Sequence, residues 1–447
     1  MVDFEIKLKH CYSYIGRLKE MKCSLLFLTL ILAIACTETW ADWPQYLGPD
    51  RNASAPKAIL AKAWPDGGPR KLWSFSLGTG YGGASVQGRD VFILDRIVGQ
   101  TDILRCIGLE SGKEKWSFTY DALGKHPHPG SRSVPTVDEE YVWIVGPFGH
   151  FHCVSRKTHQ AVWKKNLLEE FEAEKPGWGV AQSPLLYRDT VIVAPQGDKA
   201  GVVAFDKKTG LLRWASRKLS GHSCHVSPVL ASIGGVDQVI MISPCDRKDE
   251  VIKNEVVAFH ASSGQQLWTY DGLTSFACIA PATVIDDSRI FLTDCSYNGS
   301  YDPVSIMLDV TRKGESFVVK ELWKTEEVGS KIHPAVLHKD HLYLNNCGKA
   351  KGMMCLSLDG KLVWEKGTAP NFHLGAMALA DGLILSQNGA NGDLHLIEPN
   401  PKGYRELAEV ELFSLKGDEP WAPLAISDGK LLVRNSNQMI CLDLQNP

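Results

Sequence analysis

One hairpin-sized pattern recurs along the chain and constrains its fold more than any other feature. Residues 201–214 read Gly-Val-Val-Ala-Phe-Asp-Lys-Lys-Thr-Gly-Leu-Leu-Arg-Trp, which predicts an apolar strand, a tight polar turn and a returning strand that ends in tryptophan. Residues 255–268 repeat this pattern almost letter for letter. Looser copies end at Trp116, Trp163, Trp323 and Trp364. Self-similarity at a period of about 40 to 50 residues indicates a stacked or radial array of repeats.

Each repeat carries two further strand signals ahead of its hairpin. A small residue followed by proline opens a short strand, as at Ser183-Pro184 and Ser227-Pro228. Proline lacks the N–H that a central ladder needs, so it marks the first residue of a strand. A β-rich run follows after a turn, for example at residues 191–194 and 239–242. With the hairpin, this predicts four strands in each of eight repeats.

The last repeat is incomplete and predicts how the array closes. It supplies three strands and no returning tryptophan strand, while residues 70–73 form an isolated strand signal at the other end. Pairing these segments removes the exposed edges of an open array. The sequence therefore predicts an all-β fold over residues 70–447. This fold is an eight-bladed β-propeller of four-stranded antiparallel blades whose ring is closed by the N-terminal strand.

The tryptophans that end the hairpins are expected to hold neighbouring blades together. One such side chain can bury about 200 Å², or about 5 kcal/mol of gross transfer free energy at about 25 cal/mol/Å². The expected blade-docking residues are Trp73, Trp116, Trp163, Trp214, Trp268, Trp323 and Trp364. We expect residues 309–317 to replace the tight turn of the fifth repeat. The seventh repeat has no tryptophan, so we expect a weaker seam after that blade.

The amino-terminal residues are typical of an export signal. Basic residues precede the apolar run 25–35, which is too short for a stable membrane span and has the length of a secretory signal core. We therefore expect a signal peptide within residues 1–41, a lead-in segment over residues 42–69, and a periplasmic or cell-envelope protein. Met21 followed by Lys22 makes a better signal start than Met1, so we interpret residues 1–20 as an over-called extension.

Two processing routes fit this signal, and the third alternative is that the segment is not cleaved and remains as an anchor. Cleavage after Ala41 is favoured by small residues at the positions that signal peptidase reads. The run Leu-Ala-Ile-Ala before Cys36 is instead typical of a lipoprotein, with Cys36 acylated. The formal net charge of -3 gives no electrostatic case for nucleic-acid binding.

Loops that enter the first strand of each blade are expected to ring the central channel on one face. They are rich in aromatic, histidine and arginine residues. The candidate ligand or partner face comprises Tyr81, Arg132, Trp178, Gln182, His222, His225, His333, His373 and Trp421, and the same loops carry His126, His128, Phe276 and Lys331. This set predicts a pocket with aromatic walls and partly cationic polar groups, suited to an anionic or planar ligand or to a partner's peptide. Alternatively, these side chains only plug the channel.

Five cysteines are expected on that same face. They close second strands or lie in entering loops of neighbouring blades: Cys224, Cys245, Cys278, Cys295 and Cys347. In an oxidising compartment, one or two disulfides can form among them. A metal site and inert thiols are the alternatives.

The repeated hairpin, apolar-x-Ala-apolar-Asp-x-x-Thr-Gly-x-x-x-Trp, resembles the tryptophan-docking repeats of the PQQ-like (pyrroloquinoline quinone) β-propeller family. The resemblance covers about residues 43–444. Quinoprotein alcohol dehydrogenases and the outer-membrane assembly lipoprotein propeller belong to that family. The resemblance implies the fold more strongly than a function, because the docking tryptophans touch no substrate.

The family's enzymes resemble one another in a vicinal Cys-Cys disulfide over the quinone, a Glu/Asn/Asp calcium set and an Asp base. This sequence has no adjacent cysteines, and no such ligand set is found by motif. The resemblance therefore implies the non-dehydrogenase branch, a non-catalytic binding or scaffold propeller with no cofactor and a protein partner or small ligand at the axial loops. The alternatives are a PQQ- and calcium-dependent oxidoreductase and, third, a hydrolase or lyase on the same scaffold.

Overall fold

The computed structural model describes residues 42–221, 225–244, 252–275, 278–296, 302–347, 352–413 and 419–446. All of them belong to one compact unit, residues 41–447, and the other unit is residues 1–40. The predicted signal peptide and the candidate lipidation site Cys36 lie outside the described residues. None of the helices formed by the described residues has the length and apolar character that crossing a membrane requires.

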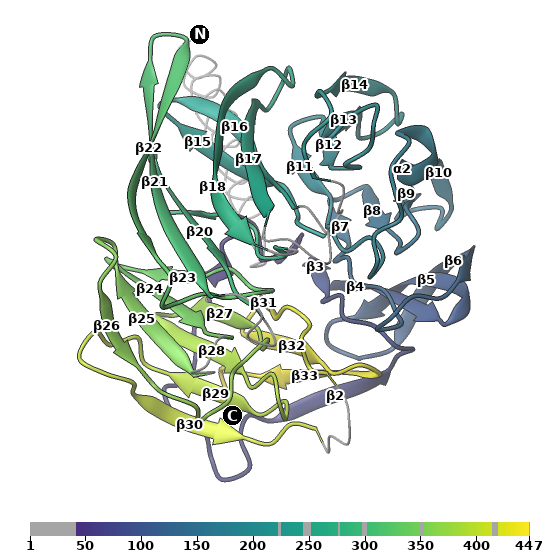
Figure 1. Cartoon of the computed structure of the whole chain (residues 1–447). Helices are drawn as coiled ribbons and strands as arrows, with labels where there is room; N and C mark the ends of the chain where they lie inside the picture. Colours follow the sequence, from purple (N-terminus) through teal and green to yellow (C-terminus); the bar gives the residue numbers. More distant parts are fainter. Residues whose placement is uncertain are drawn as a thin grey trace, which may run out of the picture. The chain divides into compact units, whose positions relative to one another are not determined.

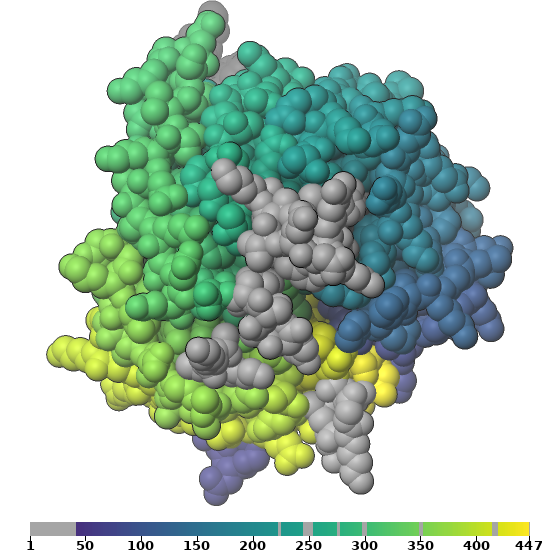
Figure 2. Space-filling view, in the orientation of Figure 1, coloured from purple at the N-terminus to yellow at the C-terminus, as the bar shows by residue number. Residues whose placement is uncertain are grey.

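Eight four-stranded antiparallel blades follow one another around a centre in sequence order (Figure 1). The colours of the sequence follow the same order around the space-filling view (Figure 2). The first four are β3 (Ser85–Gln87), β4 (Asp90–Ile97), β5 (Gly99–Gly108) and β6 (Glu114–Gly124); β7 (Thr136–Val137), β8 (Tyr141–Val145), β9 (His150–Ser155) and β10 (Ala161–Asn166); β11 (Leu185–Tyr187), β12 (Thr190–Val193), β13 (Val203–Asp206) and β14 (Leu212–Ala215); and β15 (Val229–Ile233), β16 (Val236–Ser243), β17 (Ile252–His260) and β18 (Gln266–Ser275). One helical turn, α2 (Leu167–Glu170), follows β10 and is capped by Asn166.

The remaining four blades have the same plan. They are β19 (Thr283–Val284), β20 (Arg289–Asp294), β21 (Val304–Lys313) and β22 (Ser316–Thr325); β23 (Val336–His338), β24 (His341–Asn345), β25 (Met353–Ser357) and β26 (Leu362–Glu365); β27 (Met377–Ala380), β28 (Leu383–Gln387), β29 (Leu394–Ile397) and β30 (Glu406–Val410); and β31 (Ala425–Ser427), β32 (Lys430–Arg434), β33 (Gln438–Asp443) and β2 (Lys71–Ser76). The second and third strands of each blade are almost wholly buried, which is why they read as continuous apolar runs.

The ring closes as predicted. Strand β2 pairs antiparallel with β33, and Trp73 lies opposite Cys441. The chain's N-terminal strand therefore completes the eighth blade, and no propeller edge is left open at this seam. The predictions of an all-β class, of eight blades and of this closure are confirmed.

Five hairpin tryptophans dock on the next blade in one way. Each donates its indole Nε1–H to a backbone carbonyl in the turn between the third and fourth strands of the following blade. The pairs, with Nε1···O distances of 2.7 to 3.2 Å, are Trp73 with Leu109, Trp163 with Lys207, Trp214 with Ala261, Trp323 with Leu358, and Trp364 with Asn400. Burial of the ring and a satisfied N–H together hold each seam.

Two tryptophans depart from this geometry for local reasons. Trp116 stacks on His159, with ring centroids 4.6 Å apart, because His159 stands at the turn position that is glycine in other repeats. Trp268 donates instead to Gln238 Oε1 of its own blade, at 2.7 Å. The fifth blade offers it no tight turn, because Val310 there pairs with Val319 inside the ladder.

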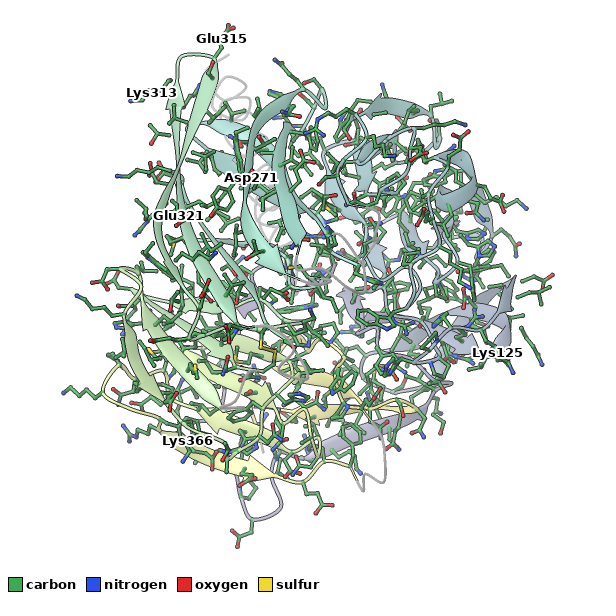
Figure 3. The ribbon with its side chains drawn as sticks, in the orientation of Figure 1. Lys125, Asp271, Lys313, Glu315, Glu321 and Lys366 are labelled. Carbon is green, nitrogen blue, oxygen red and sulfur yellow. A yellow bond between two sulfur atoms is a disulfide. The ribbon has the colours of Figure 1, made fainter. Side chains whose placement is uncertain are left out.

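The expectation of a long turn at residues 309–317 is wrong. These residues continue β21 and β22, which pair from Asp309 with Lys320 to Lys313 with Ser316, and the turn is Gly314–Glu315. The β-branched and aromatic residues Val310, Thr311 and 317–319 favour strand conformation, so strand pairing extends outward and is not replaced by a loop. Figure 3 labels Lys313 and Glu315 at the tip of this projecting hairpin.

The turn glycines of the docked repeats touch the preceding tryptophan directly. Gly264 has a φ of 70°, and a Cβ placed there would lie 2.5 Å from Cε3 of Trp214. Gly314 has a φ of 65°, but a Cβ on it would have no heavy atom within 4 Å. The glycine at this turn position of the docked repeats therefore reflects both a left-handed backbone and contact with an indole ring.

This contact predicts different costs for the same substitution at two glycines. Both Gly264→Ala and Gly314→Ala should lose about 1 to 2 kcal/mol from the left-handed conformation. Gly264→Ala should lose about 2 kcal/mol more, because the new methyl overlaps Trp214. Urea denaturation of the two variants measures the difference, and equal midpoints would show that the ring is not packed on the turn.

Residues 42–60, named here the crossing segment, pass beneath the innermost strands of several blades. Trp43 forms a bridge with Val86 of β3, Pro44 accepts from the Val137 N–H of β7, and β1 (Ser54–Ala55) pairs parallel with β27. Val137 and the partners of β1 stand at the carboxyl ends of their strands, opposite the entering loops. The crossing segment therefore closes the channel from the far side.

Candidate functional site

The entering loops surround a pocket of about 240 Å³, named here the axial pocket. All eight blades contribute a residue from the loop that precedes their first strand. The lining residues are Tyr46, Tyr81, His128, Arg132, Trp178, Ala181, Ser183, His225, Ser227, Ile279, Lys331, Ile332, His333, Leu374, Trp421 and Pro423. The pocket thus lies where the loops were expected to converge, and six of the predicted face residues line it.

One wall of the axial pocket is an aromatic cluster tied to a carboxylate. Tyr81 stacks on Trp421, with centroids 5.9 Å apart. The Tyr81 hydroxyl donates to Glu419 Oε2 at 2.6 Å, and the same oxygen is 3.0 Å from His128 Nδ1. Burial raises the pKa of Tyr81, and the hydrogen bond to Glu419 raises it further. Tyr81 therefore remains a protonated donor whose ring faces the pocket.

Arg132 stands beside this wall and is held by its own loop. Its guanidinium lies 5.4 Å from the Tyr81 ring centroid and donates to the carbonyls of Pro127, His128 and Gly130. Burial lowers the pKa of Arg132 to about 10, so the group stays charged at neutral pH. These contacts use most of the five donors of the guanidinium. Its main role in the free protein is to shape the loop between β6 and β7.

A second part of the wall is formed by Trp178 stacked on His225. Their ring centroids are 5.3 Å apart, and the interplanar angle is 28°. His225 is buried, whereas Trp178 is partly exposed toward the pocket. The two stacked aromatic pairs give the pocket flat apolar walls.

His333 and Lys331 come from the loop that enters the sixth blade. The Lys331 ammonium lies 3.2 Å from Asp294 Oδ1, and both side chains are buried, so Asp294 balances this charge. His333 Nε2 lies 3.0 Å from the carbonyl oxygen of Trp421, to which it donates. Burial lowers the pKa of His333 to about 4, which keeps the imidazole neutral. The other ring nitrogen, Nδ1, has no hydrogen-bond partner among the described residues.

The low pKa of His333 predicts a pH effect on stability. The unfolded state takes up a proton near the ordinary value of 6.5, and the folded state only near 4. The contribution of His333 to the free energy of unfolding is therefore full above pH 6.5 and falls by about 2 kcal/mol as the pH drops toward 4. One pKa unit corresponds to about 1.36 kcal/mol, and the smaller total allows for partial compensation by the surroundings of His333. The loss between pH 6.5 and 4 should be smaller by this amount in His333→Gln, as measured by urea denaturation at each pH. An unchanged pH profile in that variant would contradict the assignment.

The crossing segment supplies the floor, which sequence reasoning missed. Tyr46 lines the pocket, and Arg51 lies beside it with 4% exposure. Arg51 donates to the carbonyls of Pro184 and Pro228, which open the first strands of the third and fourth blades. Burial lowers the pKa of Arg51 to about 9. Residues 42–60 have no strand periodicity, so no sequence signal places Tyr46 in the channel.

Three other predicted face residues lie elsewhere. Gln182 is fully buried, and its amide bonds both backbone groups of Ala194, so it fixes a loop and does not face the pocket. His373 is buried with a φ of 44° and is not part of the lining. His222 lies outside the described residues, as does Phe276. His126 packs against Arg132, and burial lowers its pKa to about 4.

A disulfide joins two blades on this same face, which was one of the three alternatives for the five cysteines. Cys295 follows β20, Cys347 follows β24, and their sulfurs are bonded (Figure 3). Both half-cystines pack with Leu374 and Trp421 beside the pocket. Cys278 is a free, buried thiol, while Cys224 and Cys245 lie outside the described residues.

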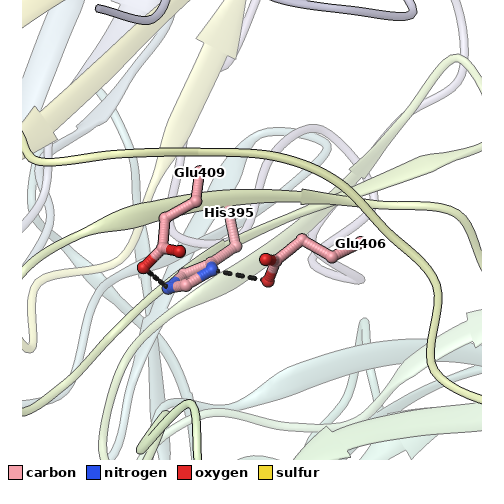
Figure 4. Close-up of side chains that lie close together, drawn as sticks. All are labelled: His395, Glu406 and Glu409. Atoms are coloured by element: carbon pink, nitrogen blue, oxygen red, sulfur yellow. Dashed lines mark hydrogen bonds and ion pairs between the residues drawn. The ribbon is translucent and has the colours of Figure 1, made fainter.

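One cluster among the described residues has the composition of a metal site, and it lies away from the axial pocket. His395 on β29 is buried, with Nδ1 2.8 Å from Glu406 Oε2 and Nε2 3.7 Å from Glu409 Oε1, both on β30 (Figure 4). Glu406 also accepts from the Tyr404 hydroxyl. These contacts tie the two outer strands of the blade that lacks a docking tryptophan. We therefore interpret the cluster as a strand clamp.

The family model described as outer membrane protein assembly factor BamB matches residues 100–366, more than half of the 447-residue chain. The chain belongs to this family of PQQ-like propellers, as its hairpins indicate. No curated protein sequence matches it.

Solved structures show the same fold at low identity. BamB from Moraxella catarrhalis is similar with a TM-score of 0.57 and 13% identity over 84% of this chain and 99% of that one. Quinohemoprotein alcohol dehydrogenase from Comamonas testosteroni has a TM-score of 0.61 and 13% identity over 91% and 81%. A europium-containing methanol dehydrogenase has a TM-score of 0.59 and 13% identity over 90% and 89%. At such identity these likenesses concern the fold alone.

Proposed function

We propose that this chain is an exported, non-catalytic propeller that binds a protein partner at the axial pocket. The observation that carries the proposal is the pocket's chemistry. Two stacked aromatic pairs line it, the cation of Lys331 is balanced by Asp294, and no carboxylate is part of the lining formed by the described residues. Aromatic anchors in a dry pocket are the residues that dominate protein interfaces. The assembly factor that names the family agrees with a binding role.

Partner binding should depend on the walls of the pocket and not on the outer strands. Trp178→Ala is expected to weaken the complex at least about 30-fold, since a central interface tryptophan contributes 2 kcal/mol or more. Leu211→Ala, at a 68% exposed side chain on an outer hairpin, is the matched control and should bind normally. The amount of partner that co-purifies with each variant from the cell-envelope fraction measures the effect. Equal loss of the partner from both variants would contradict the proposal.

A PQQ- and calcium-dependent oxidoreductase is the second candidate, and the pocket residues do not fit it. Calcium requires several oxygen ligands, but the described lining offers no Asp, Glu or Asn side chain. The cavity of about 240 Å³ also falls below the range of about 300 to 1,000 Å³ typical of drug-sized ligands. Adding PQQ and Ca²⁺ and following dye reduction with alcohols or sugars tests this directly. Turnover would overturn the non-catalytic proposal.

We further infer that export cleavage leaves Asp42 as the first residue. Asp42 is already anchored, because its carboxylate accepts from Gln87 Nε2 at 2.6 Å and from the Gly88 N–H at 2.7 Å. Amino-terminal sequencing of the protein purified from the envelope should begin at Asp42. An acylated Cys36 at the amino terminus would instead establish the lipoprotein route.

A further inference from the structure

His333, in the lining of the axial pocket, has a ring nitrogen whose hydrogen bonding the described residues do not complete. His333 is 4% exposed, and its Nε2–H is used by the carbonyl of Trp421. That tautomer leaves Nδ1 as a lone-pair acceptor, and it has no hydrogen-bond partner within the described part of the chain. Buried acceptors are nearly always paired, so an unpaired one in a pocket wall indicates a donor supplied from outside.

The charges around the pocket favour an uncharged group. Lys331 is neutralised by Asp294 at 3.2 Å, and the Arg132 guanidinium is bonded to three carbonyls of its own loop. Glu419 is engaged by Tyr81 and His128. A charged ligand would lose its hydration without meeting a free counter-charge among these groups, which is costly in a buried site.

The size and walls of the pocket favour a single aromatic ring. About 240 Å³ is too small for a drug-sized ligand, and the two stacked pairs, Tyr81 with Trp421 and Trp178 with His225, present flat faces. Rings pack on such faces with a gain of about 0.5 to 1.5 kcal/mol beyond area burial. An aromatic ring that also carries a hydrogen-bond donor can pack on these faces and donate to His333 at the same time.

We propose that the axial pocket binds a tyrosine side chain of the partner polypeptide, with the phenol O–H donating to Nδ1 of His333 and the ring packed between the aromatic walls. The inference rests on the proposed function, since it names what the partner presents. It also assigns to His333 a specificity role that a residue merely plugging the channel would not have.

Ligand pairs that differ by one hydroxyl test the inference without any partner. In the mature protein, p-cresol should bind about tenfold more tightly than toluene by calorimetry, because toluene leaves Nδ1 unsatisfied. The peptide Gly-Gly-Tyr-Gly-Gly should likewise bind about tenfold more tightly than Gly-Gly-Phe-Gly-Gly. Equal affinities, or tighter toluene binding, would overturn the hydrogen bond. Binding of p-cresol without binding of the tyrosine peptide would overturn the choice of a polypeptide.

Two substitutions at His333 separate its role from simple packing. His333→Phe should abolish the preference for p-cresol, since it removes the acceptor. His333→Gln should restore it, because the amide can donate to the Trp421 carbonyl and accept from the phenol. Thermal melts establish that each variant is folded. A hydroxyl preference that persists in folded His333→Phe would contradict the inference.

Failure of the tyrosine inference can be distinguished from failure of the proposed binding function. If Trp178→Ala abolishes partner binding and the hydroxyl preference is absent, the tyrosine inference falls and the binding role stands. If the hydroxyl preference is present and Trp178→Ala leaves partner binding unchanged, the pocket has the inferred chemistry and the proposed function falls.

Discussion

Replacing Arg51 with methionine is expected to lower the free energy of unfolding by about 4 kcal/mol, since each lost hydrogen bond from a charged donor costs about 1.5 to 3 kcal/mol. Arg51 donates to Pro228 O at 2.9 Å, to Gln45 Oε1 at 3.0 Å and to the carbonyl of Pro184. Methionine fills similar space but leaves these buried acceptors unpaired. Urea denaturation followed by tryptophan fluorescence measures the change.

Arg70→Met is the matched control for this substitution. Arg70 pairs with Asp443 at 2.7 Å, but its side chain is 62% exposed, so the loss should stay below about 1 kcal/mol. If Arg51→Met and Arg70→Met cost the same, the crossing segment does not hold the blades as described. Loss of p-cresol binding in a folded Arg51→Met protein would in addition place the pocket floor on this segment.

Removing the Cys295–Cys347 disulfide is expected to cost about as much as removing Arg51. The bond closes a loop with a sequence separation of 52 residues, for which loop entropy predicts about 4 kcal/mol. It also joins the fifth and sixth blades beside the axial pocket. The double variant Cys295→Ala/Cys347→Ala should unfold at a lower urea midpoint than the parent protein.

Reduction provides the control for the disulfide. Dithiothreitol should lower the parent midpoint toward that of the double variant and leave the double variant unchanged. The free cysteines of the described residues are buried and already reduced, so they should contribute nothing to this shift; they are Cys106, Cys153, Cys278, Cys355 and Cys441. A parent protein insensitive to reduction would contradict the expected loop-entropy effect.

Local patterns in the sequence were enough to predict the blades. A hairpin that ends in tryptophan specifies its own strands, turn and docking contact, so recurrence of residues 201–214 predicts both the repeat and the seams. Ring closure followed because the eighth repeat lacked one strand that residues 70–73 could supply. The exception, residues 309–317, shows the limit, since an insertion in a hairpin can lengthen its strands or its turn.

The candidate site could be predicted only in part. The loops that converge were identified from strand order, but the direction of each side chain is set by long-range contacts. Gln182 turns inward to the backbone of Ala194, and His333 reaches the carbonyl of Trp421 two blades away. Tyr46 and Arg51 lie in a segment without periodicity, and their place depends on contacts with distant strands that no local pattern encodes.

Site-specific photo-crosslinking in the cell envelope tests most directly whether partners bind at the axial pocket. p-Benzoylphenylalanine placed at His128, on the rim with 45% of its side chain exposed, should give a discrete adduct. The same group at Leu211, on an outer hairpin, should give none, and excess Gly-Gly-Tyr-Gly-Gly should suppress the His128 adduct. Adducts formed from Leu211 and not from His128 would place the interaction on the outer strands and contradict the account.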